Sequence, residues 1–337
     1  MRNKLYIQLL LLSVVIGAVT FVISLIAIPW LPKVASEQGE RIDDIYLFTV
    51  AICIVVFAVV AAVSVYAVFK FRAKPGDIED GKPIHGHTGI EIVWTIIPTI
   101  LVTAIGIWSA IVVVQNDDLP EGHRIVNVEA RQFAWSFNYP DEADGLNDMR
   151  MGELVVPVGE PLELHMRSPD VIHAFWVPEW RQKQDVVPGI TTFYRITPTE
   201  VGVYPIICTE LCGLGHSVMR NQVRVLSQPD FDAWLAEKRA AVDAGGADLG
   251  GNVFANLGCA ACHALDAAGA TGAVGPDLDS VLPGQSADQV RQSLVDPNAV
   301  ITEGFSEGIM PSFGSVPEDQ LEPLIEYLVG SVEALEN

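Results

Sequence analysis

Three long stretches without a charged side chain dominate the first third of the chain, and they restrict its fold more than any other feature. They cover residues 5–30, 45–69 and 92–116. Each is longer than the roughly 20 apolar residues that a helix needs to cross a bilayer. The sequence therefore predicts transmembrane α-helices at all of these positions rather than core helices of a soluble protein.

Basic residues around these stretches predict the orientation of the helices. Arg2 and Lys4 precede the first stretch, and the loop between the second and third carries four more basic residues: Lys70, Arg72, Lys74 and Lys82. Positively charged flanks remain in the cytoplasm. We therefore expect a multi-pass protein of a bacterial plasma membrane, with everything after about Asp117 on the outer face.

The first apolar stretch is either a signal anchor or a cleaved signal peptide. It exceeds the roughly 7–15 residues of a signal-peptide core, but Val34, Ala35 and Ser36 behind it are the small residues that a signal peptidase accepts. We expect the helix to be retained. Either fate leaves the C-terminal part outside.

The region that follows the membrane part is rich in short β-strand patterns separated by Pro, Gly and Asp. The expected strands are residues 124–128, 154–156, 161–166, 191–196, 203–207 and 222–225. Short strands at such spacing are typical of an all-β sandwich or barrel. A helical pattern at 229–243 and the Gly-rich segment 244–247 then connect this region to the rest of the chain.

The last part of the chain is strongly acidic. The whole sequence has 20 Lys and Arg against 42 Asp and Glu, a formal net charge of −22, which excludes a nucleic-acid partner. After residue 247 the only basic side chain is Arg291. This segment is not a disordered acidic tail, because Leu321, Leu324 and Leu328 repeat at the spacing of a helix face.

A cysteine pair in the acidic segment has the pattern of covalent haem attachment. Cys259, Cys262 and His263 form C-x-x-C-H, in which two thiols bind the haem and the histidine is the proximal ligand. A disulfide is the alternative in an oxidising compartment. Beyond His263 the segment has no further histidine or lysine and a single methionine, Met310, which we predict as the sixth iron ligand. His/Met ligation suits electron transfer.

The same segment resembles a class I cytochrome c, an all-α domain. Phe254 falls on a short helix before the haem motif, and residues 321–328 would form the terminal helix. Pro317 suits the first position of that helix. Pro323 is a departure, because a proline inside a helix removes a hydrogen bond.

A second cysteine pair lies in one loop after an expected strand, together with other soft ligands. Cys208, Cys212, His216 and Met219 fall within this loop, and His173 comes from an earlier strand. Thiolate, imidazole and thioether favour copper, and zinc is the competitor. Zinc has no use for Met219, and a second thiolate indicates sulfurs that bridge two metal ions. His123 and His165 are less well placed.

With these residues together, the stretch 41–226 resembles cytochrome c oxidase subunit II and its cupredoxin domain with binuclear copper (copper A). The resemblance implies these copper ligands: His173, Cys208, Cys212, His216, Met219 and the backbone carbonyl of Glu210. It also implies that the Glu210 side chain points to a magnesium site shared with subunit I.

The resemblance assigns roles to three further residues. Glu91 matches the entrance of a proton pathway into subunit I, although it could equally be a helix cap. In the aromatic stretch 132–139, Phe133 stands where many members of the family have the tryptophan that receives electrons from soluble cytochrome c, and Trp135 follows it. A haem held by a linker reaches a high effective concentration, so it need not dock tightly.

The resemblance extends to oxidases of the caa3 type, in which a cytochrome c domain is fused to the C-terminus of subunit II. The expected parts are a first hydrophobic segment with an outer loop (1–44), a transmembrane hairpin (45–120), a cupredoxin domain (121–228), a linker (229–247) and a cytochrome c domain (248–337). Electrons would pass from haem c to copper A and on to haem a of subunit I, where oxygen reduction is coupled to proton pumping.

The expected partners are oxidase subunits I and III, the membrane, and a cytochrome c or cytochrome bc complex as electron donor. We expect no oxygen chemistry on this chain itself. Three alternatives remain: a quinol oxidase subunit II, which lacks the copper ligands, a membrane-anchored copper-binding assembly factor, and a structural zinc module. An assembly factor needs exposed, exchangeable ligands and has no use for an attached haem.

Overall fold

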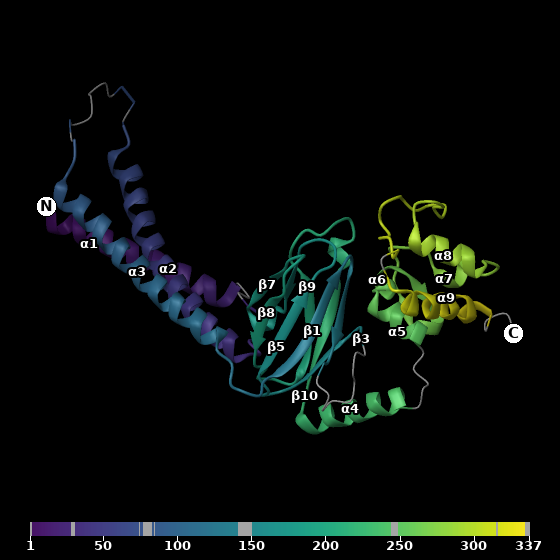
Figure 1. Cartoon of the computed structure of the whole chain (residues 1–337). Coiled ribbons are helices and arrows are strands. Elements are labelled where there is room, and N and C mark those ends of the chain that lie inside the picture. Colours follow the sequence, from purple (N-terminus) through teal and green to yellow (C-terminus); the bar gives the residue numbers. More distant parts are fainter. Residues whose placement is uncertain are drawn as a thin grey trace. The chain divides into compact units, whose positions relative to one another are not determined.

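The computed structural model describes residues 2–27, 31–73, 75–76, 83, 85–140, 150–243, 249–314 and 316–333 (Figure 1). Among these residues are three helices long and apolar enough to cross a membrane. They are α1 (Arg2–Ala27), α2 (Glu37–Phe71) and α3 (Thr88–Asp117). The predicted membrane helices are therefore confirmed as elements: α2 and α3 extend beyond both ends of their uncharged stretches, and α1 begins before its stretch.

The membrane helices contact one another through small and aromatic residues. A Cβ on Gly17 of α1 would lie 3.4 Å from the Cβ of Ala58 in α2, and the rings of Phe48 and Trp108 join α2 to α3 at 5.4 Å. Most other apolar side chains of these helices are exposed. Such surfaces are stable in lipid or against another membrane protein.

The segment Val34–Gly39, which includes the first residues of α2, belongs to the same compact unit as the chain after residue 117. The N–H of Ala35 donates to the carbonyl of Glu179, and the carbonyl of Ala35 accepts from Thr199. Ser36 forms a β-bridge with Pro198 and is completely buried. The small residues that suggested a cleavage site are thus built into the edge of the domain that follows α3.

The part of the chain that follows α3 begins as a sandwich of two five-stranded sheets (Figure 1). One sheet has the order β3-β2-β1-β5-β8, with bounds Arg150–Met151, Ala134–Asn138, Arg124–Arg131, Leu162–Arg167 and Thr192–Ile196. The other has the order β4-β10-β9-β6-β7, with bounds Leu154–Pro157, Arg220–Leu226, Gly202–Cys208, His173–Trp176 and Lys183–Val186. β1 pairs parallel with β5, and β4 pairs parallel with β10.

All six expected strands are present, and the sandwich fold is confirmed. Their patterns alternate between buried and accessible residues, as in β5, where Leu162, Leu164 and Met166 are buried. The expected ranges did not include β2, β3, β6 or β7, although His173 on β6 was expected to lie on a strand. β3 has only two residues, and β2 and β6 are short and mostly buried without a clear alternation.

The helix α4 (Gln228–Asp243) follows the sandwich, as the sequence predicts. The Gly-rich segment 244–247 lies outside the described residues. Phe231 and Trp234 on the first turns of α4 are buried in the core of the sandwich. Most of the segment expected as a linker is therefore a helix whose first turns are part of the core of the sandwich.

The last part of the chain is helical. Its helices are α5 (Leu249–Asn256), α6 (Cys259–Cys262), α7 (Leu278–Val281), α8 (Ala287–Val295) and α9 (Glu318–Glu333), with a small sheet of β11 (Ala264–Leu265) and β12 (Ala270–Thr271). Short 3-10 turns lie at Pro178–Trp180, His216–Val218 and Asp266–Ala268. Phe254, Leu321, Leu324 and Leu328 are in one core.

The terminal helix α9 continues through Pro323. It begins directly after Pro317, whose carbonyl accepts from Leu321, so the predicted helix start is close to the observed one. Gly250 of α5 packs against the backbone of Pro323 and the side chain of Tyr327, where any Cβ would collide. The glycine permits this close helix crossing.

Candidate copper and haem sites

The loop between β9 and β10 gathers the ligands predicted for copper. Cys208 is the last residue of β9, and Met219 directly precedes β10. The N–H of Cys208 donates to the carbonyl of Met219 at 3.2 Å, which closes the loop at its base. The β-pairing of β9 with β10 therefore fixes where the loop starts and ends.

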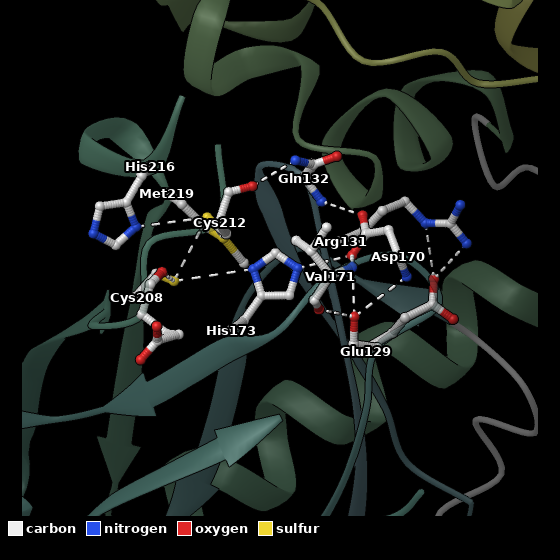
Figure 2. Close-up of polar contacts among 12 residues, drawn as sticks. Glu129, Arg131, Gln132, Asp170, Val171, His173, Cys208, Cys212, His216 and Met219 are labelled. Atoms are coloured by element: carbon white, nitrogen blue, oxygen red, sulfur yellow. Dashed lines mark hydrogen bonds and ion pairs between the residues drawn. The ribbon is translucent and has the colours of Figure 1, made fainter. Parts of the chain in front are cut away.

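The two thiols and two imidazoles face one another (Figure 2). The Sγ atoms of Cys208 and Cys212 are 3.8 Å apart, far beyond the roughly 2.05 Å of a disulfide. Nδ1 of His173 lies 4.0 Å from Sγ of Cys208, and Nδ1 of His216 lies 3.5 Å from Sγ of Cys212. Each sulfur thus has an imidazole beside it, and the cysteines are free.

Two further donor atoms complete the set. Sδ of Met219 is 3.7 Å from Sγ of Cys212, and the carbonyl oxygen of Glu210 is 3.3 Å from Sγ of Cys208. His173, Cys208 and Met219 are nearly or fully buried. Two sulfurs placed between two nitrogens, with one thioether and one carbonyl, match a site for two soft metal ions rather than one tetrahedral zinc. The donor set therefore fits binuclear copper.

The carboxylate of Asp170 contacts the imidazole of His173 on the side opposite the cysteine sulfurs. Oδ1 of Asp170 lies 2.9 Å from Nε2 of His173, and Oδ2 accepts from the N–H of Gln132 at 2.7 Å (Figure 2). Burial opposes the charge of Asp170, but these hydrogen bonds and one from Val171 prevail and lower its pKa to about 2. The ionised carboxylate fixes the ring of His173 with Nδ1 toward the sulfurs.

The two thiols differ in acidity. Burial opposes ionisation of Cys208, but hydrogen bonds from His173 and from backbone groups lower its pKa to about 7. Burial and the neighbouring charge of Cys208 raise the pKa of Cys212 to about 12. Cys208 therefore ionises more readily than Cys212.

The C-x-x-C-H motif lines an apolar cavity in the helical domain. Cys259, Cys262 and His263 lie on its wall with Met310, among apolar side chains that include Leu257 and Phe313. Burial raises the pKa of Cys259 to about 12 and also raises the pKa of Cys262. Both thiols therefore stay neutral until they react. Thiols, one imidazole and one thioether around an apolar cavity fit a covalently bound haem.

The backbone orients the candidate proximal histidine. Nδ1 of His263 lies 2.8 Å from the carbonyl of Pro276, which leaves Nε2 available to a metal ion. Burial lowers the pKa of His263, so the ring is neutral as a metal ligand must be. A Cβ on Gly275 would come within 2.6 Å of this ring, so the position accepts only glycine.

Other predicted residues lie at distinct places. Trp135 is buried and packs edge-on against His173 with 6.3 Å between ring centroids. Phe133 is in the turn between β1 and β2 and is also buried. The Glu210 residue is exposed. Glu91 accepts a hydrogen bond from the N–H of His87 at 2.9 Å, which is the geometry of a helix cap.

The remaining histidines of the sandwich lie away from the loop between β9 and β10, which is called the copper loop below. Nε2 of His165 is 2.6 Å from Glu163, and Nδ1 of His123 is 3.1 Å from the carbonyl of Pro120. The sequence reasoning overlooked Asp170, Gln132 and Pro276. Asp170 could have been found as an acidic residue three positions before an expected ligand histidine, whereas the contacts of Gln132 and Pro276 come from the fold.

Three family profiles cover the chain. Residues 24–112 match the transmembrane domain of cytochrome c oxidase subunit II, and residues 124–226 match its periplasmic domain. Residues 245–328 match a profile described as cytochrome c oxidase, cbb3-type, subunit III.

Curated relatives match over most of their length. A protein of Alkalihalophilus pseudofirmus named cytochrome c oxidase subunit 2 is 32% identical over 307 residues, which are 86% of this chain and 87% of the relative. A Bacillus subtilis protein of the same name is 26% identical over 88% and 90% of the two chains. The solved periplasmic domain of subunit II from Bradyrhizobium japonicum is 27% identical and covers 36% of this chain and 98% of its own, with a TM-score of 0.33.

Proposed function

This chain belongs to the cytochrome c oxidase subunit II family and carries a cytochrome c domain after its copper domain, and we propose from this premise which of its residues hold each redox centre. The chain is a membrane-bound oxidase subunit and a partner of subunit I. Copper A and haem c, when bound, supply one-electron chemistry that relays electrons toward oxygen reduction in subunit I.

The proposed copper ligands are the six donors gathered by the loop after β9: His173, Cys208, the Glu210 carbonyl, Cys212, His216 and Met219. The observation that carries this assignment is the 3.8 Å separation of the Cys208 and Cys212 sulfurs, each with an imidazole beside it. Asp170 orients His173, and the buried surroundings exclude water from the sulfurs.

The proposed haem site consists of Cys259 and Cys262 as attachment points, with His263 and Met310 as axial ligands. Pro276 sets the orientation of the His263 ring through its carbonyl. Met310 lies on the cavity wall and packs partly against the core of the helical domain. If His263 and Met310 both held the iron, the bound haem would suit electron transfer rather than oxygen binding.

The finer assignments are also proposals. The exposed Glu210 residue would offer a carboxylate to magnesium at the subunit I interface, and Glu91 would line the entrance of a proton pathway in addition to capping α3. We propose subunit III and a cytochrome c or cytochrome bc complex as further partners. Basic flanks on the loop before α3 support a plasma-membrane location with both redox domains on the outer face.

Burial of the copper ligands argues against the alternative of a copper-binding assembly factor. His173 and Met219 are fully buried, and Cys208 and Cys212 are only 4% and 3% exposed. A protein that hands over copper needs ligands that a partner can reach. The buried arrangement instead suits a resident centre.

The test is to remove one proposed copper ligand, the thiol of Cys208, in the assembled oxidase and so to block electron transfer from the haem to the copper site. In Cys208→Ser, reduced donor should still reduce the haem, but oxygen should reoxidise it more than about 100-fold more slowly than in the parent enzyme. Cys53→Ser, which changes an exposed thiol in α2, is the matched control. Rapid haem reoxidation in Cys208→Ser would refute the proposed relay.

A further inference from the structure

The segment between α8 and α9 is a long loop that carries Met310 (Figure 1). Residues 297–311, called the ligand loop here, form no helix or strand, and most of them line the haem cavity. Residues 298–308 are all exposed. A loop with so few buried contacts opens easily. Local contacts must therefore decide whether Met310 stays at the cavity.

On the C-terminal side of Met310, the chain is fastened to the end of α8. Oγ of Ser312 donates to the carbonyl of Val295 at 2.5 Å, and the N–H of Phe313 donates to the carbonyl of Leu294 at 2.9 Å. Phe313 is also buried in the core of the helical domain. The backbone is therefore fixed two residues after Met310.

On the N-terminal side of Met310, the side chain of Asn298 fastens the loop. Its amide oxygen accepts from the N–H of Gly308 at 2.8 Å, which ties the start of the ligand loop to the point two residues before Met310. Other hydrogen bonds within the described ligand loop, such as that from Phe305 to Thr302 at 3.1 Å, close single turns. Asn298 and Ser312 therefore bracket Met310 at equal distances along the chain.

Loss of the bond from Asn298 would release one side of this bracket. The residues before Met310 would gain conformational freedom, while the anchor at Ser312 would remain, so closing the loop would cost more entropy. After residue 247 the chain has no lysine and no histidine except His263. The helical domain thus has no other strong ligand to replace Met310, and the vacant position would be open to an external molecule.

We propose that Asn298 is a positioning residue for Met310. Its hydrogen bond with Gly308 keeps the ligand loop closed over the haem cavity and keeps external ligands away from the iron. Apolar and uncharged polar side chains dominate the cavity lining, so small uncharged ligands such as neutral imidazole are the ones that an open loop admits. This proposal rests on the proposed function, because it takes His263 and Met310 as the iron ligands.

The experiment follows imidazole binding to the oxidised haem of the purified full-length chain in detergent. At high imidazole concentration the binding rate is limited by loop opening. In Asn298→Ala we expect this limiting rate to rise about 5-fold, the effect of losing one hydrogen bond. The absorbance band that marks methionine ligation of oxidised haem should weaken at the same time.

Two further variants identify the hydrogen bond as the cause. Asn298→Asp keeps an oxygen acceptor for the N–H of Gly308, so its rate and its absorbance should stay close to those of the parent. Glu307→Ala, at an exposed position next to Gly308, is the matched control within the ligand loop. A parent-like rate and spectrum in Asn298→Ala would overturn the role of Asn298, and so would an Asn298→Asp variant that binds imidazole as fast as Asn298→Ala.

Met310→Ala separates this proposal from the proposed function. Without the thioether, imidazole need not wait for the loop, so its binding rate should keep rising in proportion to its concentration. A parent that behaves in the same way would refute Met310 as an iron ligand and with it the proposed haem site. A parent that reaches a limiting rate, with Asn298→Ala equal to it, would refute only the positioning role of Asn298.

Discussion

The copper site and the haem site are both built from two cysteines, histidine and methionine, but the chain prepares them differently. Around the copper loop, the donor atoms already lie within about 4 Å of their neighbours, and Asp170 fixes the ring of His173. In the cytochrome domain, Cys259, Cys262, His263 and Met310 line an apolar cavity. At the copper site the donor atoms are already close together, whereas the haem residues surround an apolar cavity.

The difference follows from the size of the cofactor. Metal ions are small, so a folded sandwich can position their ligands in advance. A haem is as large as several side chains, and it replaces part of the hydrophobic core of a small domain. The copper domain should therefore fold without its metal, and the cytochrome domain should depend on its haem.

Removing the haem should have the largest effect. In the double variant Cys259→Ala and Cys262→Ala, we expect no covalent haem and loss of the cooperative unfolding transition of residues 249–333, because the cavity has no occupant. The copper content should be unchanged. Calorimetry and metal analysis of the complex test this, with chelation of copper from the parent as the comparison. A native-like transition in the haem-free domain would contradict the contrast between the two sites.

Removing the sixth iron ligand should have a smaller effect. Met310→Ala should keep the haem, since the thioethers remain, but lower its reduction potential on the order of 100 mV. A redox titration followed by haem absorbance measures this. A potential equal to that of the parent would show that Met310 only packs in the cavity wall. Met219→Ala in the copper loop is the corresponding variant of the other site.

Removing the carboxylate behind His173 should weaken copper binding without unfolding the sandwich. Asp170→Asn keeps the shape of the side chain but loses its charge. Loss of the carboxylate that binds a metal-ligating histidine typically reduces metal affinity about 10–100-fold. Competition with a chelator measures the affinity. Asp185→Asn on the neighbouring strand β7 serves as the control, because its side chain is exposed. Equal affinities in both variants would remove the orienting role of Asp170.

Removing one charged residue of an ion pair should have the smallest effect, and this effect should be on the free energy of unfolding. Burial opposes the charge of Glu163, but hydrogen bonds from His165 and Arg195 lower its pKa below the usual 4.5. A depressed pKa contributes stability above pH 4.5, and this stability is lost as the pH falls through the folded pKa. Glu163→Gln should therefore cost about 1 kcal/mol at neutral pH and nothing in acid.

The matching variant in the cytochrome domain is Glu318→Gln. Glu318 pairs with Arg291 at 2.8 Å on the surface, where solvent screens the interaction. Its substitution should leave the unfolding temperature of that domain unchanged across the same pH range. If Glu163→Gln also left the stability unchanged at neutral pH, the contacts of Glu163 with His165 and Arg195 would have no net effect on stability.

The sequence predicted candidate ligand residues that the structure brings close together, but it did not predict the groups around them. The motif around Cys259 and the loop around Cys208 predict ligand types because metal chemistry requires particular donors at short spacing. The membrane helices and most strands follow from hydrophobic patterns in the same way. The strand that carries Trp135 was missed because its residues are buried without the alternation of a half-exposed strand. The contacts of Asp170 with His173 and Gln132 could not be predicted because they depend on the fold.

The most direct test of the account is metal analysis combined with electron paramagnetic resonance on the purified protein. We predict two copper ions per haem and a seven-line hyperfine pattern, because one unpaired electron would be shared equally between two copper ions held by Cys208 and Cys212. One zinc ion, or a single copper with a four-line pattern, would contradict the binuclear site. The chain would then be a cytochrome attached to a sandwich domain that does not relay electrons.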